Sequence, residues 1–348
     1  MTSRVVQDAM SGTGSAMSFE HPVFFYRGED EYLATLVPFI RAGAAAGEPV
    51  AVAVPSGNLR LLRGALGVPD PDTDTDTDRN RDPDPDPDPD PDRSVRFLDM
   101  ALVGRNPGRI LPKVLLAFAD AHRSGRVRII GEPVWPGRAP REYPACVQHE
   151  ALINAAFHGR DVTLVCPYDA DRLPAETLAD ARVTHPALIE DGRESVSDHF
   201  SPTRALARGN EPLTDEGGAD AAAYDFDDRR LHGARRFAAR IASRLGMAEE
   251  ARATLSLIVA ELTTNSVVHG GGRGTLRLWA EGDQLVCEVR DPGLLRDALA
   301  GRLPPPVDRP GGRGLLLVND FATLVRMHTG PGGTTVRAHL DLRPRPLP

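Results

Sequence analysis

The fold of the C-terminal third is indicated by the stretch ELTTNSVVHG at residues 261–270, which ends a predicted helix, Ala248–His269. Apolar residues recur along this helix at the spacing of one buried face. Glu261, Asn265 and His269 follow one another at four-residue intervals, so they form one polar row beside the apolar stripe. Such a row is common on helix faces in solvent, and its interpretation depends on the segments around it.

The surrounding segments predict an α+β domain. A second amphipathic helix precedes the polar row, and two pairs of strands with alternating apolar residues follow it. The first pair runs directly into Asp291-Pro-Gly293, and the turn Gly311-Gly-Arg-Gly314 opens another apolar helix. The expected elements are helices Asp228–Leu245 and Ala248–His269 and strands Thr275–Ala280, Gln284–Arg290, Thr323–His328 and Thr334–Leu342.

The polar groups in these segments suit the binding of a nucleotide. The amide oxygen of Asn265 is a hard, neutral ligand for Mg²⁺, which keeps phosphate oxygens and waters as its other ligands. Glu261, one turn earlier, can orient or deprotonate a hydroxyl group near the γ-phosphate. Asp291 at a strand end can accept a hydrogen bond from an exocyclic amine, which selects adenine, and Gly293 lets the base approach the backbone.

The chain offers no suitably placed lysine for the phosphates. A Walker P-loop requires a lysine after its glycine-rich turn, and the only lysine, Lys113, lies in the stretch ILPKVLL. Gly311, Gly312 and Gly314 would instead bring backbone N–H groups close to the phosphates, at the amino end of a helix. Arg313 is interpreted as an exposed arginine of the same turn.

Taken together and in this order, these motifs resemble those of the GHKL (Bergerat-fold) ATPases. ELTTNSVVHG is similar to the N-box of that family, DPG to its first glycine box and GGRGLLLV to its second. The resemblance covers about residues 223–343 and implies a two-layer α+β sandwich that binds ATP and Mg²⁺. It implies Glu261 as the catalytic residue, Asn265 as the Mg²⁺ ligand, and Asn265, His269, Asp291, Gly293, Gly311, Gly312 and Gly314 as the nucleotide-binding residues.

Three classes of GHKL protein are compatible with these motifs. A sensor histidine kinase carries a phosphoacceptor histidine on a dimerising helical hairpin, but only the short polar segment 195–222 precedes this domain. The short domain resembles the anti-sigma-factor serine kinases, which bind a sigma factor and phosphorylate a serine of an anti-anti-sigma (STAS-type) partner. In that class Glu261 would be the general base. A non-catalytic, ATP-gated binding module is the third class, against which Glu261 argues without excluding it.

The N-terminal half predicts an α/β domain with a mainly parallel sheet. The stretch Val50–Val54 is too continuously apolar for a half-exposed strand, and strands and helices alternate after it. His21, Phe24-Phe25-Tyr26, this strand and Cys166-Pro-Tyr-Asp169 before His185-Pro186 resemble the MEDS family. The resemblance covers about residues 19–194 and implies a RecA-related sensory domain without a phosphate loop, which responds to an unknown small-molecule or protein signal.

Two groups of polar residues in this half are candidates for a site. Glu132 follows a strand, at the end where ligands often bind in parallel sheets, but a loop carboxylate in solvent is the favoured interpretation. The histidines do not have the separations of ligands on one helix face, and isolated histidines are usually surface or hydrogen-bonded groups. No metal site is therefore expected among His21, His149, His158 and His185.

Composition limits the remaining possibilities. The eleven aspartates and three arginines of residues 70–93 account for the whole formal charge of −8, so the remainder is neutral and no basic patch indicates nucleic acid. That tract is interpreted as a disordered, solvated insertion rather than a calcium loop, because the glycines and spacing of such a loop are missing. Residues 1–18 are expected to be disordered and 195–222 to be a linker.

The chain is expected to be a cytoplasmic regulator. It has no apolar run of about 18 residues and no signal-peptide pattern, so no membrane partner is predicted. Cys146, Cys166 and Cys287 are far apart in the sequence, which indicates neither a disulfide framework nor a zinc site. The sequence leaves the oligomeric state open, with a homodimer as one alternative.

Overall fold

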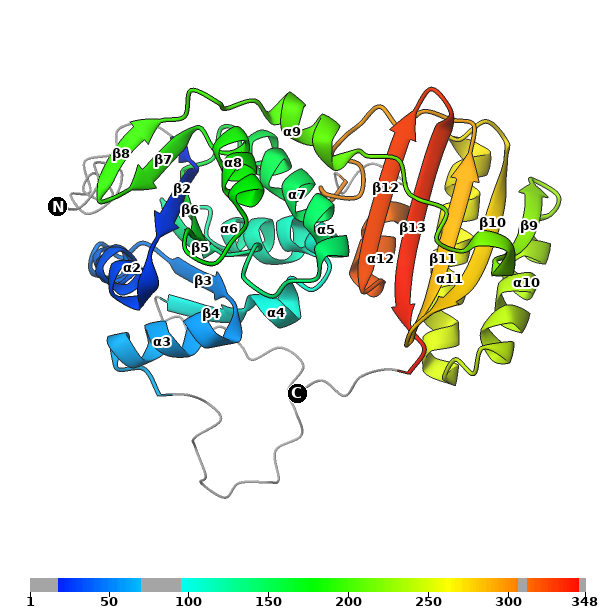
Figure 1. Cartoon of the computed structure of the whole chain (residues 1–348), viewed down its shortest axis with the longest axis horizontal. Helices are drawn as coiled ribbons and strands as arrows, with labels where there is room; N and C mark the ends of the chain where they lie inside the picture. Colours follow the sequence, from blue (N-terminus) through cyan, green and yellow to red (C-terminus); the bar gives the residue numbers. More distant parts are fainter. Residues whose placement is uncertain (1–17, 70–94, 306–311, 344–348) are drawn as a thin grey trace, which may run out of the picture. The chain divides into compact units, whose positions relative to one another are not determined.

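The computed structural model describes residues 18–69, 95–305 and 312–343 (Figure 1). The expected disordered N-terminus, up to residue 17, and the Asp/Pro insertion lie outside these residues. The chain folds into two compact units, each formed by more than one stretch of sequence. Unit 1 comprises Met1–Val103, Val114–Arg138 and Phe157–Ser201, and unit 2 comprises Gly104–Lys113, Ala139–Ala156 and Pro202–Pro348.

Unit 1 is built on an eight-stranded, mainly parallel sheet with the order β4-β3-β5-β6-β2-β7-β8, in which β1 also pairs with β6. Only the β7–β8 pair is antiparallel among the described pairs. Strands β2, β3, β5 and β6 are buried along their whole length, as expected for parallel strands. The strands are β1 (Phe19–Glu20), β2 (Pro22–Tyr26), β3 (Val50–Val54), β4 (Val95–Asp99), β5 (Val127–Gly131), β6 (Val162–Asp169), β7 (Ala187–Glu190) and β8 (Arg193–Val196).

Helices accompany this sheet, and the predicted α/β class of the N-terminal half is confirmed. The longest helix of unit 1, α2 (Gly28–Ala45), contributes Leu36, Phe39 and Ile40 to a core that includes the side chains of β3. Its burial follows from the helical spacing of these residues. The remaining helical elements of this half are α3 (Ser56–Leu66), α4 (Met100–Val103), the π-helical segment η2 (Ile110–Leu115), α6 (Leu116–Ala121) and α8 (Ala175–Thr184).

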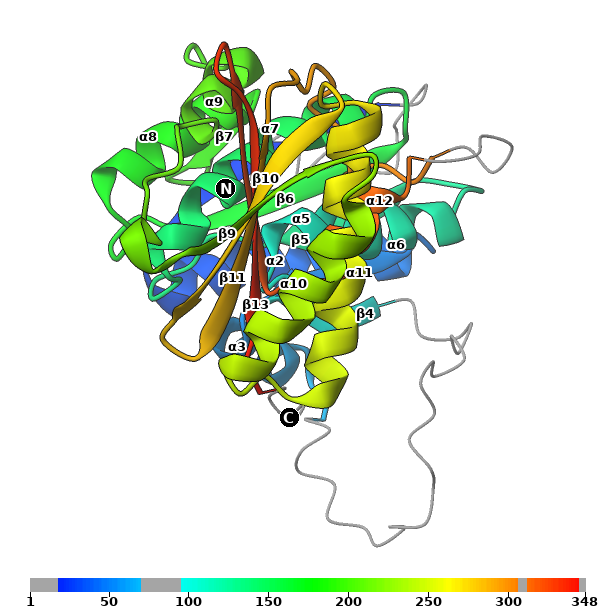
Figure 2. The ribbon, with the colours of Figure 1, turned by 90° about the vertical axis from the view of Figure 1, so that its right-hand side faces the viewer.

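Unit 2 contains a five-stranded antiparallel sheet with the order β12-β13-β11-β10-β9. Figure 2, in which this sheet is seen nearly edge-on, shows the two long helices α10 and α11 on one of its faces. The predicted α+β class is therefore confirmed. The elements are β9 (Ala222–Asp227), α10 (Leu231–Arg244), α11 (Glu249–Val268), β10 (Arg273–Glu281), β11 (Gln284–Asp291), α12 (Gly314–Phe321), β12 (Leu324–Gly330) and β13 (Gly333–Asp341).

The period of two along each strand separates the two faces of this sheet. On the helix side, Leu276, Leu278, Leu285 and Cys287 pack with apolar residues of α10 and α11 in one core. On the other side, Glu288 is fully buried and is bonded by arginines. A buried carboxylate in a sheet requires such partners, because leaving a buried charge unpaired is costly.

The segment predicted to be a linker, residues 195–222, is partly regular structure. It includes the end of β8, α9 (Pro202–Gly209) and η4 (Gly218–Asp220), and it passes Arg337, which donates hydrogen bonds to Thr214 O (2.6 Å) and Glu216 (2.7 Å). The sequence could not show this, because the partner is more than a hundred residues away in the chain. Unit 2 also contains the elements α5 (Pro107–Arg109), η3 (Pro140–Glu142) and α7 (Tyr143–Ala156).

None of the helices in the described part of the chain combines the length and the apolar character needed to cross a membrane.

Candidate functional site

The polar row predicted on the helix lies on α11, against the first residue of α12. Glu261 and Asn265 are both half-buried and stand one turn apart. A methyl group added to Gly314 would lie 2.6 Å from Glu261 Oε2 and 3.1 Å from Asn265 Nδ2. The structure therefore brings Glu261, Asn265 and the amino end of α12 together, and the absence of a side chain at Gly314 allows that approach. His269, the third member of the row, is exposed at the C-cap of α11.

Asp291, the last residue of β11, is held in a fixed orientation beside the same helix. Its Oδ2 accepts a hydrogen bond from Ser266 Oγ (2.7 Å), and its Oδ1 accepts one from the backbone N–H of Gly293 (2.9 Å). Burial raises the pKa of Asp291, and these two hydrogen bonds oppose that rise. A methyl group on Gly270 would lie 2.4–2.6 Å from this carboxyl group, so the end of α11 packs directly on it.

The backbone around Gly293 is equally close-packed. A methyl group there would clash with Gly270 Cα at 2.4 Å. Only glycine, which has no side chain, therefore allows the two backbones to approach this closely. The carbonyl oxygen of Gly293 accepts a hydrogen bond from Thr334 Oγ1 (2.9 Å), and Thr334 pairs with Asp291 in the β11–β13 register.

Sequence reasoning missed Ser266 and Thr334. Ser266 follows Asn265 directly, but a serine inside a helix is not by itself a signal. Thr334 could have been found only from the pairing of β11 with β13, which joins segments far apart in the chain.

The second glycine turn is described only in part. Gly311 lies outside the described residues, whereas Gly312 is exposed with φ +79°, a left-handed conformation that favours glycine. Arg313 is exposed, as expected, and is the N-cap residue of α12. The chain's only lysine, Lys113, pairs with Asp320 (3.0 Å), so it serves a structural contact.

The described residues fit a nucleotide with a metal ion. They combine a half-buried carboxylate at a strand end that could accept a hydrogen bond from adenine, an amide oxygen that suits Mg²⁺, and the amino end of a helix for phosphate. All of these groups come from α11, the end of β11 and the start of α12, which are adjacent elements of one unit.

A second polar cluster lies in unit 1, at the carboxyl edge of its parallel strands. Glu132, which follows β5, is fully buried and accepts hydrogen bonds from Asn58 Nδ2 (2.9 Å to each oxygen), Tyr32 OH (3.1 Å) and Tyr26 OH (3.4 Å). The interpretation of Glu132 as a loop carboxylate in solvent is therefore wrong. Its burial depends on α2, β2 and α3, whose arrangement around the loop is not visible in the sequence.

Burial is the main cause that raises the pKa of Glu132, and the hydrogen bonds from Asn58 and the two tyrosines partly oppose it. The resulting pKa is about 8. Between about pH 4.5, the ordinary pKa of a glutamate, and about pH 8, Glu132 therefore keeps its proton in the folded state and loses it in the unfolded state. By linkage, the resulting stabilisation is complete below about pH 4.5 and is lost as the pH rises towards 8.

We expect Glu132→Gln to flatten this part of the pH dependence. Between these pH values the free energy of unfolding of the wild type should fall by about 1 kcal/mol per pH unit more than that of the variant. Urea unfolding across this range measures the difference, with Glu29→Gln on the exposed start of α2 as the control. Parallel pH profiles for wild type and Glu132→Gln would show that Glu132 is not protonated in the folded state.

Two family models match the chain. Residues 20–186 match the MEDS family, the MEthanogen/methylotroph, DcmR Sensory domain, and residues 225–340 match the Histidine kinase-like ATPase domain. Both resemblances inferred from the motifs, and their order along the chain, are thus confirmed. The second match indicates ATP binding by unit 2.

Among solved structures, the chain is similar to the RsbU and RsbW domains of Rv1364c from Mycobacterium tuberculosis. The two are 14% identical, with a TM-score of 0.27, and the match covers 59% of this chain. It spans about half (48%) of the length of that structure. No curated protein matches the chain.

Proposed function

Because the chain combines a MEDS sensory-domain segment with a histidine kinase-like ATPase segment, we propose that it is a signalling regulator in which Mg-ATP binds to unit 2. In this proposal the ATPase domain spans residues 223–343 and the sensory domain spans residues 19–194. An unidentified small-molecule or protein signal at the sensory domain controls the activity.

We further propose that unit 2 is a serine kinase of the anti-sigma-factor type. It would bind a sigma factor and phosphorylate a serine of an anti-anti-sigma (STAS-type) protein, and thereby regulate transcription. The observation that carries this proposal is the position of Glu261, one turn from Asn265 and against Gly314. A carboxylate in that place can take the proton of an attacking hydroxyl group while Asn265 holds the Mg²⁺ of the same nucleotide.

Each of the other predicted residues has a role in this proposal. Asp291, oriented by Ser266 and Gly293, would accept from the adenine amine. The backbone N–H groups of Gly311, Gly312 and Gly314 would contact the phosphates, and bound Mg²⁺ would neutralise phosphate charge in place of a lysine. His269 is exposed at the end of the row and is proposed to contact the nucleotide from the edge of the site.

The helices before the ATPase segment favour a serine kinase over a histidine kinase. In the described part of the chain, the last α-helix before β9 is α9, which has only eight residues. That is too short for a dimerising hairpin with a phosphoacceptor histidine. In this proposal the serine that accepts phosphate belongs to a partner protein.

A transfer assay tests the proposal. The full-length chain is incubated with γ-labelled ATP, Mg²⁺ and a panel of purified anti-anti-sigma proteins. We expect acid-stable label on a serine of one partner. Acid-labile, alkali-stable label on the chain itself would indicate a histidine kinase instead. If ATP binds but no panel member is labelled, the kinase proposal fails and the ATP-gated binding module is favoured.

A further inference from the structure

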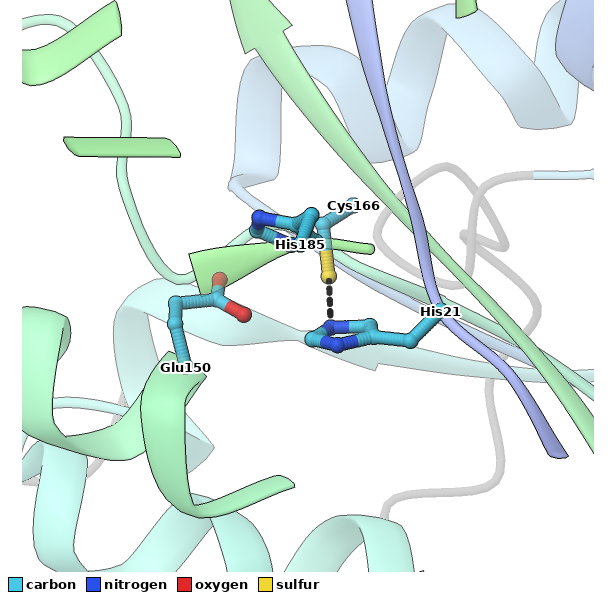
Figure 3. A group of neighbouring side chains, drawn as sticks. All are labelled: His21, Glu150, Cys166 and His185. Atoms are coloured by element: carbon cyan, nitrogen blue, oxygen red, sulfur yellow. Dashed lines mark hydrogen bonds between the residues drawn. The ribbon is translucent and has the colours of Figure 1, made fainter. Parts of the chain in front are cut away.

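Three side chains of kinds that bind metal ions meet in the interior of unit 1: His21, Cys166 and His185 (Figure 3). They are 1%, 1% and 0% exposed, and their ligand atoms all lie within 4.8 Å of one another. His21 directly precedes β2, Cys166 lies in β6 and His185 follows α8. Figure 3 also draws Glu150, which belongs to unit 2.

The sheet topology places these residues together although they are far apart in the sequence. Strand β2 pairs in parallel with β6 on one side and with β7 on the other, with Val23 opposite Cys166 and Pro22 opposite Ala187. The cluster therefore forms near the amino ends of β2 and β7. The Glu132 cluster lies at the carboxyl edge of the same sheet, so the two clusters are separate.

The hydrogen bonds of His185 determine which of its ring nitrogens can bind a metal ion. Its Nδ1 lies 2.8 Å from the carbonyl oxygen of Ala181, and a carbonyl can only accept. Nδ1 therefore carries a proton, and Nε2 is the ring nitrogen whose lone pair can bind a metal ion. A backbone carbonyl that holds Nδ1–H in this way is the usual partner of a histidine that binds metal through Nε2.

The separation of His21 and Cys166 suits two ligands of one ion. Cys166 Sγ lies 3.4 Å from His21 Nε2, and the rings of His21 and His185 are 4.2 Å apart between centroids. Tetrahedral zinc with Zn–S of about 2.3 Å and Zn–N of about 2.0 Å places a sulfur and a nitrogen ligand about 3.5 Å apart. The distance between Cys166 Sγ and His21 Nε2 already matches that separation.

We propose that His21, Cys166 and His185 bind one Zn²⁺ ion inside unit 1. A thiolate with two imidazoles suits zinc, whereas Mg²⁺ and Ca²⁺ prefer oxygen ligands. Binding forms one Zn–S and two Zn–N bonds and breaks the S–H bond of Cys166, whose proton passes to solvent. Zinc in proteins is almost always four-coordinate, so a fourth ligand completes the site.

This zinc site is independent of the nucleotide proposal, because all three residues lie in unit 1. A hydrogen-bonded group of neutral side chains would satisfy the same contacts without an ion. The two alternatives differ in an observable way, because only the zinc site binds a divalent cation through a thiolate.

Cobalt substitution of the full-length chain tests the proposal. The protein is treated with a chelator, dialysed and titrated with Co²⁺, and Zn²⁺ is then added in competition. We expect one Co²⁺ per chain, with the thiolate-to-cobalt charge-transfer band and the intense visible absorption of a four-coordinate ion, both removed by Zn²⁺. Cys166→Ser should lose the charge-transfer band and bind Zn²⁺ at least about 100-fold more weakly, since removing only an outer-shell partner of a metal ligand costs about 10- to 100-fold.

Matched variants provide the controls. Cys287→Ser removes a buried thiol of unit 2, and His158→Gln removes an exposed imidazole of unit 1, so both should bind Co²⁺ like the wild type. If Cys166→Ser does not fold by circular dichroism, His185→Gln serves as the second variant and should bind Zn²⁺ about 100-fold more weakly too. Wild-type protein that binds no Co²⁺, or binds it without the charge-transfer band, would overturn the proposal, as would a folded Cys166→Ser with unchanged affinity.

Discussion

Replacing Asp291 by asparagine should weaken ATP binding about 100-fold. A hydrogen bond from a neutral donor to a carboxylate contributes about 1.5–3 kcal/mol, and each 1.4 kcal/mol is a factor of about ten in affinity. In the wild type, Ser266 and Gly293 donate hydrogen bonds that orient the two carboxylate oxygens of Asp291. Asparagine has only one oxygen that can accept such a bond. Its NH₂ group can then face the amine of adenine, and two donors cannot form a hydrogen bond with each other.

Calorimetric titration of the full-length chain with ATP and Mg²⁺ measures this effect. GTP provides a second comparison, because it carries a carbonyl where adenine carries the amine, and the wild type should therefore discriminate against it. We expect Asp291→Asn to narrow the preference for ATP over GTP. Asp228→Asn, an exposed carboxylate just before α10, is the control and should bind like the wild type. A folded Asp291→Asn that binds ATP as tightly as the wild type would exclude Asp291 from the adenine site.

The second large effect is expected from Glu261→Gln in the transfer assay. Removing a general base lowers the rate by about 100- to 10,000-fold. Glutamine has nearly the same shape and keeps the contact with Gly314, so ATP affinity should change little. A loss of transfer with retained binding is the result that a catalytic role predicts and that a purely structural role does not.

Glu250→Gln is the matched control, because Glu250 lies in the exposed first turn of the same helix, α11. Its transfer rate should equal that of the wild type. If Glu261→Gln transfers phosphate at the wild-type rate, Glu261 is not the base. If it loses ATP binding to the same extent as transfer, its role is in binding alone.

The parts of the fold that the sequence predicted are those with local signals. The helix α11 follows from the spacing of its apolar residues, and its end follows from the glycines after His269. Strands β10 and β11 follow from the alternation of apolar residues, and Asp291 follows from its place at a strand end. Each of these signals lies within the segment that it describes, so no knowledge of distant partners was needed.

The parts that the sequence did not predict depend on partners far away in the chain. Strand β9 is too short for its sequence to mark it as a strand, and it is held in the sheet by its pairing with β10. Glu132 looks like a solvent-exposed carboxylate until Tyr26, Tyr32 and Asn58 are placed around it.

The His21–Cys166–His185 cluster is the strongest example of this limit. The three residues are not spaced along the sequence like the ligands of a known metal-binding motif. Only the parallel pairing of β2 with β6 and β7 brings them together. The expectation of no metal site rested on spacing along the chain, which says little about residues on neighbouring strands.

Asn265 is proposed to hold the Mg²⁺ of a nucleotide on α11, and this role can be tested by measuring how much Mg²⁺ strengthens ATP binding. ATP affinity is measured by calorimetry with and without Mg²⁺ for the wild type, for Asn265→Ala and for Thr264→Ala, an exposed neighbour on the same helix. We expect Mg²⁺ to strengthen ATP binding at least about tenfold in the wild type and in Thr264→Ala, and to have little effect in Asn265→Ala. An equal gain in ATP affinity from Mg²⁺ in all three proteins would exclude Asn265 as the Mg²⁺ ligand.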